Sequence, residues 1–514
     1  MLKLSSDNTL IFPTVVLATT LLAASYITSK IKDTKTETKR KRRVSFTTQS
    51  IAMGALPDHM EMFEPVIQVL ISFPSIAEMP TEEEITNTLV PRFLKLDRMK
   101  GIPRKLGKEW AFVPKENLNP EQFVKCVDVT CNSIKELGDQ AQKLNDDELR
   151  AKERDLPWWE FVLLRNHSKE FSESMLVLRI DHAIGDGLSI GRVCSLIMTN
   201  IDGSEVHSLV PSNLVLNKKK SSIIQEKMKL SEILLLPLRT MKACLSILFL
   251  PWTRVDHQIA FSKGVVGRHA KNSGVRKLIV FDEIPLDFVK KIKNKAKISL
   301  NDVLIVTLSQ AIHDFCHYKE CAVIKKGRRV ICKATMTFGI PRDHPDLNEV
   351  LHNGWYPLSL SLGVGHEDIF QRIKHVTKGT KELKTTPIVV FQALLQDKVM
   401  AFLPRKLSKY IAGAVYKAHS LTCTNVPGPQ NQVMIMGKCV KNCRFSIGHL
   451  HSVLSMLSYD GKINVTLVAD DDAIEDVHLF PVFFHRALVK LGEAFEVEIP
   501  QEVKNASNLD RCSI

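Results

Sequence analysis

The chain has 514 residues, of which 44% are hydrophobic and 25% charged, so it is long enough for two or three domains with a large core, and a disordered protein is excluded. The net charge of +14 would suit a nucleic-acid-binding protein, but much of the excess lies after an N-terminal apolar segment and in Lys218-Lys219-Lys220. We therefore expect an anionic membrane surface or the phosphates of a coenzyme as the partner, and no nucleic acid.

The N-terminal segment has the features of a membrane anchor. Residues Asn8 to Ser29 carry no charge, and Leu10–Ile27 is long enough to cross a hydrocarbon layer of about 30 Å as a helix. Lys30 to Arg43 then contains eight basic and two acidic residues, which predicts a cytosolic C-terminal side. We expect an endoplasmic reticulum or lipid-droplet location, and the alternative is a signal peptide cleaved near Ala23-Ala24-Ser25.

The 11 cysteines are scattered, and the closely spaced pairs include Cys316/Cys321 and Cys439/Cys443. Neither pair has cysteine or histidine partners at the spacing of a metal site. The sequence therefore predicts reduced thiols facing the cytosol and no metal centre.

Apolar periodicity outlines an N-terminal half of mixed structure. Helical spacing occurs over Ile85–Leu96 and Pro120–Leu137, and the aromatic element Asp155–Trp159 is interpreted as a strand entry or a cleft wall. An alternating run over Met175–Ile180 predicts a half-buried strand, followed after a turn by a helix that reaches about Asn200.

His182 follows this strand directly and precedes the turn Gly185-Asp186-Gly187. A histidine at a strand end can line a cleft, and histidine side chains, with an unperturbed pKa of about 6.5, accept protons near neutral pH. We interpret His182 as a general base for a hydroxyl or thiol. The alternative is a loop histidine before an ordinary Asp-Gly turn, in which Asp186 holds the turn and Gly187 permits a close approach or a positive φ.

The segment between Gly203 and Gly274 separates two halves. Its apolar part, Ile233–Trp252, is interrupted by Arg239 and Lys242, so that no charge-free piece is long enough to span a bilayer. An interfacial helix on a membrane and a buried interdomain helix both fit.

Long helices and non-sequential strands predict an α/β or α+β second half. Ser299 or Asn301 is expected to cap a helix that carries Leu304, Leu308, Ala311 and Phe315 on one face. Expected strands are Lys277–Phe281, Val330–Phe338, Pro357–Leu362, Val433–Met436, Ser452–Ser458 and Ile463–Val468. Expected helices are Leu286–Lys295, Asp368–Leu383, Phe391–Phe402, Leu407–Ala418 and one within Asp472–Phe495.

Five motifs in one order resemble those of the wax ester synthase/diacylglycerol acyltransferase (WS/DGAT) family. They are Leu156-Pro157-Trp158, Asp181-His182-Ala-Ile-Gly-Asp-Gly187, Asn301-Asp302-Val-Leu304, Asn425-Val-Pro-Gly-Pro429 and Ser455–Gly461. The resemblance covers about Met53 to Pro500, and it departs from the family pattern at Asp181, which replaces the first histidine of HHxxxDG.

The resemblance implies an α/β, two-domain, chloramphenicol acetyltransferase-like (CoA-dependent acyltransferase) fold with a tunnel between the halves. Long-chain acyl-CoA would enter one mouth, and a fatty alcohol or diacylglycerol the other, without a cofactor. The expected domains are an anchor over 1–45, acyltransferase halves over 46–202 and 275–500 joined by a linker over 203–274, and a tail over 501–514.

The resemblance also assigns roles to the motif residues. His182 would be the base, and Asp186, Gly187 and Asp181 would belong to the structural motif. Asn301 and Asp302 would give polar or oxyanion support at the tunnel, with a helix N-cap as the alternative for Asn301. Asn425, Pro427 and Gly428 would shape the coenzyme side.

Two other functions remain open at this stage. Plant BAHD acyltransferases share HxxxDG but carry a DFGWG signature that this sequence lacks. A membrane-bound lipid-binding protein that kept the fold and lost turnover is the other alternative, and Asp181 is its only support. His352, His449 and His451 compete as base but lack the setting of a strand followed by a glycine turn.

Overall fold

The computed structural model describes residues 45–52, 65–106, 109–146, 149, 152, 154–206, 236–262, 275–325, 330–339, 344, 346–448 and 451–509. The predicted span Leu10–Ile27 and the cluster Lys218-Lys219-Lys220 lie outside these ranges. Within them, no helix combines the length and apolar character that crossing a bilayer requires.

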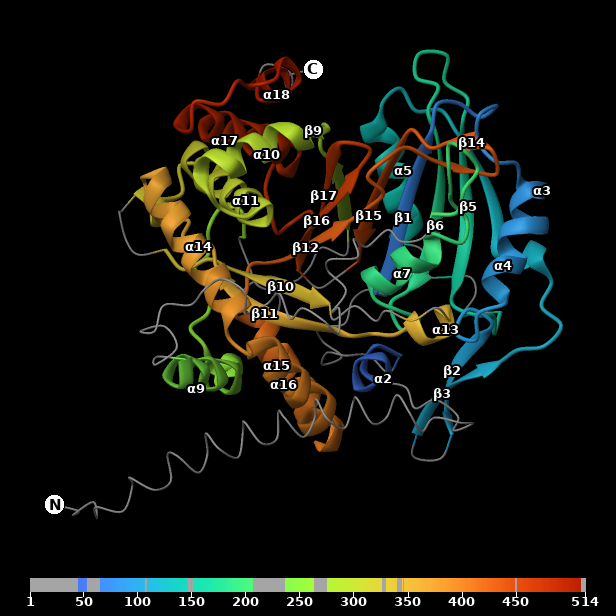
Figure 1. Ribbon diagram of the computed structural model, residues 1–514, viewed down its shortest axis with the longest axis horizontal. Helices are drawn as coiled ribbons and strands as arrows, with labels where there is room; N and C mark the ends of the chain where they lie inside the picture. Colours follow the sequence, from blue (N-terminus) through green and yellow to red (C-terminus); the bar gives the residue numbers. More distant parts are fainter. Residues whose placement is uncertain are drawn as a thin grey trace.

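Two large sheets lie side by side, each with its own helices (Figure 1). The N-terminal half is built on five strands in the order β15-β1-β6-β5-β4, all antiparallel except the parallel pair β4 and β5. These strands are β1 (Val66–Phe73), β4 (Val124–Val129), β5 (Trp159–Asn166), β6 (Ser174–Asp181) and β15 (Asn442–Ile447).

This first sheet is covered on both faces. α5 (Ile134–Asp146) packs on one face through Leu137 and Ala141, and α4 (Val90–Leu94) and α7 (Gly187–Cys194) pack on the other. Every residue of β1 and β6 is therefore buried. The strand predicted over Met175–Ile180 is confirmed, but the prediction that it is half-buried is wrong, because helices cover both faces of the sheet.

The second half contains a seven-stranded sheet with the path β11-β10-β12-β16-β17-β8, and β9 pairs with β17. Its strands are β8 (Arg276–Val280), β9 (Ile284–Pro285), β10 (Lys333–Gly339), β11 (Trp355–Ser361), β12 (Leu421–Pro427), β16 (Ser452–Tyr459) and β17 (Lys462–Asp470). Its longer helices are α10 (Leu286–Ala296), α11 (Leu300–Tyr318), α14 (Ile369–Thr385), α16 (Arg405–Lys417) and α17 (Phe480–Ala494). Most of the predicted strands and helices of this half are confirmed, with ends that shift by a few residues. Phe391–Phe402 is instead divided among an α-helix, a π-helix and a 3-10 helix, and β9, β12 and β15 were not predicted.

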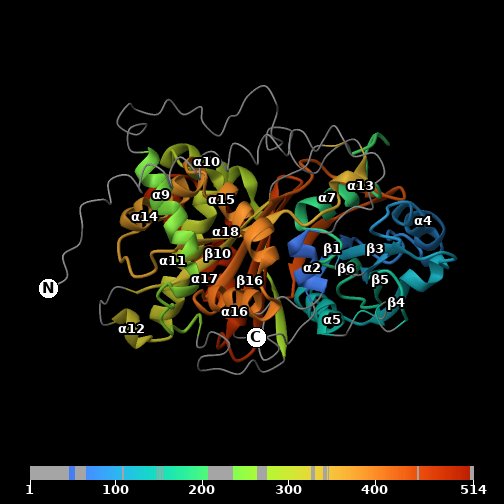
Figure 2. The same ribbon diagram turned by 90° about the horizontal axis from the view of Figure 1, so that it is seen from below.

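The remaining elements are short or lie at the edges of the two sheets (Figure 2). They are α2 (Phe46–Ala52), α3 (Glu82–Glu84), η1 (Ile85–Leu89), β2 (Gly101–Leu106), β3 (Glu109–Pro114), η2 (Pro120–Phe123), β7 (Thr199–Asn200), α9 (Leu236–Leu248), η4 (Leu250–Trp252), α12 (Ala322–Lys325), α13 (Leu347–Val350), α15 (Ile388–Leu394), η5 (Leu395–Val399), η6 (Met400–Phe402), β13 (Val433–Ile435), β14 (Lys438–Cys439), η7 (Val477–Leu479) and α18 (Gln501–Ala506).

The chain crosses back from the second half to the first. β15 pairs antiparallel with β1, and β13 pairs with β7. β15 therefore covers an edge of β1 that would otherwise expose a row of backbone N–H and C=O groups. The predicted halves are linked by sheet hydrogen bonds, which the linear division into 46–202 and 275–500 did not include.

Two predictions for the N-terminal half are wrong. Pro120–Leu137 is not one helix but a 3-10 turn, then β4, then the start of α5. Val124, Val127 and Val129 supply β-branched side chains that pack well in a sheet, and this outweighs their apparent helical spacing. The helix after His182 ends at Cys194 rather than near Asn200, because β7 then pairs with β13.

Candidate active site

His182 lies in the turn after β6 and contacts a residue from the other half of the chain. Its backbone N–H donates to the carbonyl of Pro65 at 2.8 Å, which fixes the start of the turn. Its ring Nδ1 lies 3.0 Å from Oδ1 of Asn353, which precedes β11 and is 3% exposed. The side chain at the predicted base position is therefore held from both halves.

The surroundings of Asn353 determine the orientation of its amide and the tautomer of His182. The amide Nδ2 donates to the carbonyls of His182 at 2.7 Å and Ala183 at 3.2 Å, and to the Thr48 hydroxyl at 3.0 Å. Backbone carbonyls can only accept hydrogen bonds, so the Asn353 atom that faces them is the amide nitrogen. The other amide atom, which faces the His182 ring, is therefore the oxygen. Nδ1 of His182 must then carry the proton, which leaves the lone pair on Nε2. No residue in the described ranges hydrogen-bonds to Nε2.

The walls around His182 come from β11 and α2. The Trp355 ring lies with its centroid 5.7 Å from that of His182, and its indole N–H is buried without a hydrogen bond to any described residue. α2 brings Thr48 against Asn353, and Thr47 of the same helix accepts a hydrogen bond from Gln396 at 2.7 Å. The Trp355 ring and α2 therefore border the histidine on two sides.

Asp186 is buried, and its carboxylate holds two backbone segments together. Its Oδ1 accepts hydrogen bonds from the backbone N–H and the hydroxyl of Ser189, so Asp186 is the N-cap of α7. Its Oδ2 accepts a hydrogen bond from the N–H of Gly354 at 2.8 Å. The Asp186 N–H donates in turn to the His352 carbonyl. These contacts fix Asn353 beside His182, and in the described part of the chain the Asp186 carboxylate makes no hydrogen bond to the His182 ring.

The backbone requires glycine at Gly428 but not at Gly187. The expectation of a positive φ or a close approach at Gly187 is wrong, because it lies in the first turn of α7 and an added Cβ would meet Val426 at an ordinary 3.6 Å. An added Cβ at Gly428 would lie 2.3 Å from the Ser458 carbonyl, so the turn requires glycine. The Asn425–Pro429 turn thus passes against the start of α7 and is pinned to β16.

Asn301 and Asn425, from two separate motifs, meet in the structure. Nδ2 of Asn425 donates to Oδ1 of Asn301 at 3.1 Å. The alternative of Asn301 as N-cap is wrong, because Ser299 caps α11 and Asp302 completes a capping box with it. Asp302 also lies 3.6 Å from the Lys384 ammonium, so its contacts are those of a helix terminus. Pro427 ends β12 beside this pair.

His352 and His451, also proposed as bases, are buried, and each precedes a strand where His182 follows one. Nδ1 of His352 donates to the Val350 carbonyl at 2.7 Å. Burial lowers the pKa of His451 to about 4. His449 lies outside the described residues.

The buried carboxylate of Asp181, the residue that replaces the first histidine of HHxxxDG, contacts Lys152 and the backbone of the turn after β6. Its Oδ2 lies 2.8 Å from the Lys152 ammonium, and its Oδ1 accepts from the Ala183 N–H at 2.8 Å. Lys152 also lies over the Trp158 ring, 4.6 Å from its centroid. Asp181, where the sequence departs from the family motif, therefore forms an ion pair with Lys152. Because Lys152 also contacts Trp158, it links the HxxxDG and Leu-Pro-Trp motifs.

We expect Asp181→His, which restores the family pattern, to lower the free energy of unfolding by about 3 kcal/mol, because Lys152 loses the carboxylate inside a largely buried site. Urea denaturation of Asp181→His, Lys152→Met and the double variant measures this. The double variant should recover most of the loss. An Asp181→His protein as stable as the parent would contradict the ion-pair assignment.

Asn353 was missed by the sequence reasoning. It is 171 positions from His182, and its only local signal is an Asn-Gly pair before a strand, which usually marks a turn. Of the predicted residues, the structure brings Asn301 to Asn425 and sets Asp186 and Gly187 at one turn with His182.

Comparisons with known proteins identify the class. The fold matches a WS/DGAT from Marinobacter aquaeolei VT8 at 14% identity, with a TM-score of 0.58, covering 89% of this chain and 100% of that one. It also matches a trichothecene 15-O-acetyltransferase from Fusarium sporotrichioides at 11% identity and a TM-score of 0.55, over 88% and 94% of the two chains. The predicted CoA-dependent acyltransferase fold is thereby confirmed.

Sequence comparisons are more specific. The WS/DGAT C-terminal domain model matches residues 353–492. Wax ester synthase/diacylglycerol acyltransferase 2 of Arabidopsis thaliana is 23% identical over 471 residues, which cover 83% of this chain and 90% of the relative. A putative diacylglycerol O-acyltransferase of Mycobacterium tuberculosis is 22% identical over 376 residues, 66% of this chain and 68% of the relative. The chain is therefore similar in sequence to wax ester synthase/diacylglycerol acyltransferases, and residues 353–492 match the C-terminal domain of that family.

Proposed function

We propose that this protein is an acyl-CoA-dependent O-acyltransferase that makes neutral lipids, either wax esters from fatty alcohols or triacylglycerol from diacylglycerol. The similarity to this family supports the reaction class, because the relatives are named for these two products. The observation that carries the chemistry is the His182–Asn353 pair, which leaves Nε2 as a proton acceptor.

In the proposed reaction, Nε2 of His182 takes the proton of the acceptor hydroxyl while its oxygen attacks the thioester carbon. The tetrahedral intermediate collapses as the C–S bond breaks, and the imidazolium returns the proton to the CoA thiolate. The thioester is already activated, so no covalent enzyme intermediate and no cofactor are required. We propose that Asn301 gives polar support to the oxyanion. Asn425, Pro427 and Gly428 are proposed to shape the coenzyme side of the site.

The test is CoA release from palmitoyl-CoA by the purified full chain, with hexadecanol, with diacylglycerol or with neither. We expect thiol release that depends on an acceptor, with the matching ester found by lipid analysis. Binding of palmitoyl-CoA without acceptor-dependent release would favour the lipid-binding alternative and reject the enzyme assignment.

We expect Asn353→Ala to lower kcat about tenfold to a hundredfold with little change in KM, since the imidazole loses the group that fixes its tautomer and direction. The matched control is Thr48→Val, which removes another hydrogen-bond partner of Asn353 without touching His182. Steady-state kinetics of both variants check this. An equal loss in both would indicate general loosening of the site instead of orientation of the base.

We also propose that the protein docks on a membrane surface through the patch formed by α9, η4 and α16, in addition to the predicted anchor at Leu10–Ile27. η4 packs against α16, and both elements expose large apolar side chains among basic ones. The exposed apolar residues are Leu238, Leu245, Leu248, Phe249, Trp252, Leu407 and Tyr410. The neighbouring basic residues are Arg239, Lys242, Arg405, Lys406 and Lys409. This composition is typical of an interfacial surface that also attracts anionic headgroups.

The sequence left two alternatives for Ile233–Trp252, an interfacial helix and a buried helix, and the described residues of this segment include both exposed and buried apolar side chains. Ile247 and Leu250 are buried, and Ile247 belongs to the core of the second half, whereas Phe249 and Trp252 are 61% and 68% exposed. A charge at Ile247 would therefore damage the fold and would not test membrane docking.

The patch predicts that, in a chain lacking residues 1–40, Phe249→Asp plus Trp252→Asp reduces sedimentation with vesicles of phosphatidylcholine and phosphatidylserine at least about tenfold. Ile201→Asp, at a residue 61% exposed outside the patch, serves as the control and should bind like the parent truncation. If the parent truncation does not bind the vesicles in low salt, the patch is not a docking surface.

A further inference from the structure

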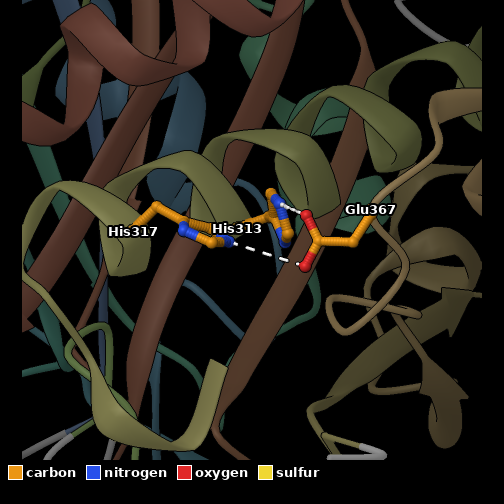
Figure 3. A group of neighbouring side chains, drawn as sticks. All are labelled: His313, His317 and Glu367. Carbon is orange, nitrogen blue, oxygen red and sulfur yellow. Dashed lines mark ion pairs between the residues drawn. The ribbon is translucent and has the colours of Figure 1, made fainter. Parts of the chain in front are cut away.

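His313, His317 and Glu367 converge at one point on the second half (Figure 3). The two histidines are four residues apart on α11 and therefore lie on the same face of the helix, and Glu367 comes from the segment before α14. One ligand atom from each residue lies within 4.8 Å of the others. The sequence analysis predicted no metal centre from the spacing of the cysteines. This cluster offers nitrogen and oxygen ligands and no cysteine, so that argument does not apply to it.

The separations favour a shared ion over direct hydrogen bonds. Nε2 of His313 lies 3.4 Å from Oε2 of Glu367, and Nε2 of His317 lies 3.8 Å from Oε1. A charge-assisted hydrogen bond would bring such atoms to about 2.7–2.9 Å. Two ligands bound at about 2.0–2.1 Å to a tetrahedral zinc ion are about 3.3 Å apart. The 3.4 Å between His313 and Glu367 is close to this value, and the other separations, all within 4.8 Å, would shorten on binding.

The orientation of His313 is fixed as it is in metal sites. Its Nδ1–H donates to the Val364 carbonyl at 2.8 Å, which leaves the lone pair on Nε2, the atom nearest the carboxylate. A hydrogen bond from the second ring nitrogen to a carbonyl is the usual support of a metal-bound imidazole. Nε2 of His317 is buried and makes no hydrogen bond to any described residue, so an ion would satisfy it.

We propose that His313, His317 and Glu367 bind a divalent transition-metal ion of the zinc class, with water in the fourth position. The ion can enter from solvent, because the Glu367 side chain is 70% exposed. The positive charge of the Arg372 guanidinium would repel a metal ion at this site. The negative charges of Asp314, Glu367 and Asp368 act on the same guanidinium and offset its charge.

The site would clamp α11 to the segment before α14. His313 is 12 positions along α11 from Asn301, about 18 Å at the rise of an α-helix, so we assign the ion to stability rather than to acyl transfer. This inference does not depend on the proposed function.

The test uses the purified full chain, stripped with a chelator and titrated with Zn²⁺ in a calorimeter and with Co²⁺ in an absorption spectrometer. The variants are His317→Gln and Glu367→Gln, both at partly exposed residues, and the matched control is Glu382→Gln, an exposed residue on α14. Melting temperatures with and without Zn²⁺ are measured for each protein.

We expect one Zn²⁺ per chain, a Zn²⁺-dependent rise in the parent melting temperature, and visible Co²⁺ bands typical of tetrahedral nitrogen and oxygen ligation. Each ligand variant should lose at least about tenfold in affinity and lose the thermal shift, while Glu382→Gln should match the parent. Zn²⁺ binding that survives in both ligand variants would place the ion elsewhere, for example on cysteines. That result, or the absence of a thermal shift in the parent, would overturn the proposal.

Discussion

His182→Ala should lower kcat/KM for ester synthesis by about 10²- to 10⁴-fold, because the acceptor hydroxyl loses its proton acceptor. The imidazole is only half-buried and lies in a turn, so its removal creates little cavity in the core. The variant should therefore keep the parent melting temperature and still bind palmitoyl-CoA.

A control variant makes this prediction specific. His352→Ala removes a neighbouring histidine whose ring contacts the Val350 carbonyl and the Ser189 hydroxyl, and it should keep far more activity than His182→Ala as long as it folds. Retention of more than about a tenth of parent activity in His182→Ala would show that another group is the base.

Asp186→Ala should cost about 2–4 kcal/mol in the free energy of unfolding as well as nearly all activity. The buried N–H of Gly354 and the first turn of α7 lose their acceptor together, and each such loss costs about 1–2 kcal/mol. Asn353 then loses its fixed position beside His182. Urea denaturation and kinetics on the same preparation measure both effects.

Asp186→Asn keeps one acceptor oxygen and should retain more stability than Asp186→Ala. A fully stable but inactive Asp186→Ala protein would contradict the structural role, since it would mean that the carboxylate acts in the reaction itself.

The pattern of residues near His182 was sufficient to predict its strand, its turn and its role as the candidate base. These features depend on local rules: an apolar run for β6, and glycine and aspartate for the turn that begins α7. The order of the five motifs was sufficient to predict the family and hence the fold.

The partners of these residues could be decided only by the tertiary structure. Asn353 reaches His182, Lys152 reaches Asp181, and β15 pairs with β1 across most of the chain, although nothing in the adjacent sequence specifies these pairings. The same holds for the convergence of Glu367 with His313 and His317. Local propensity is set by a few neighbouring residues, whereas these contacts depend on how two sheets and their helices pack, so the direction of each side chain follows from the assembled fold.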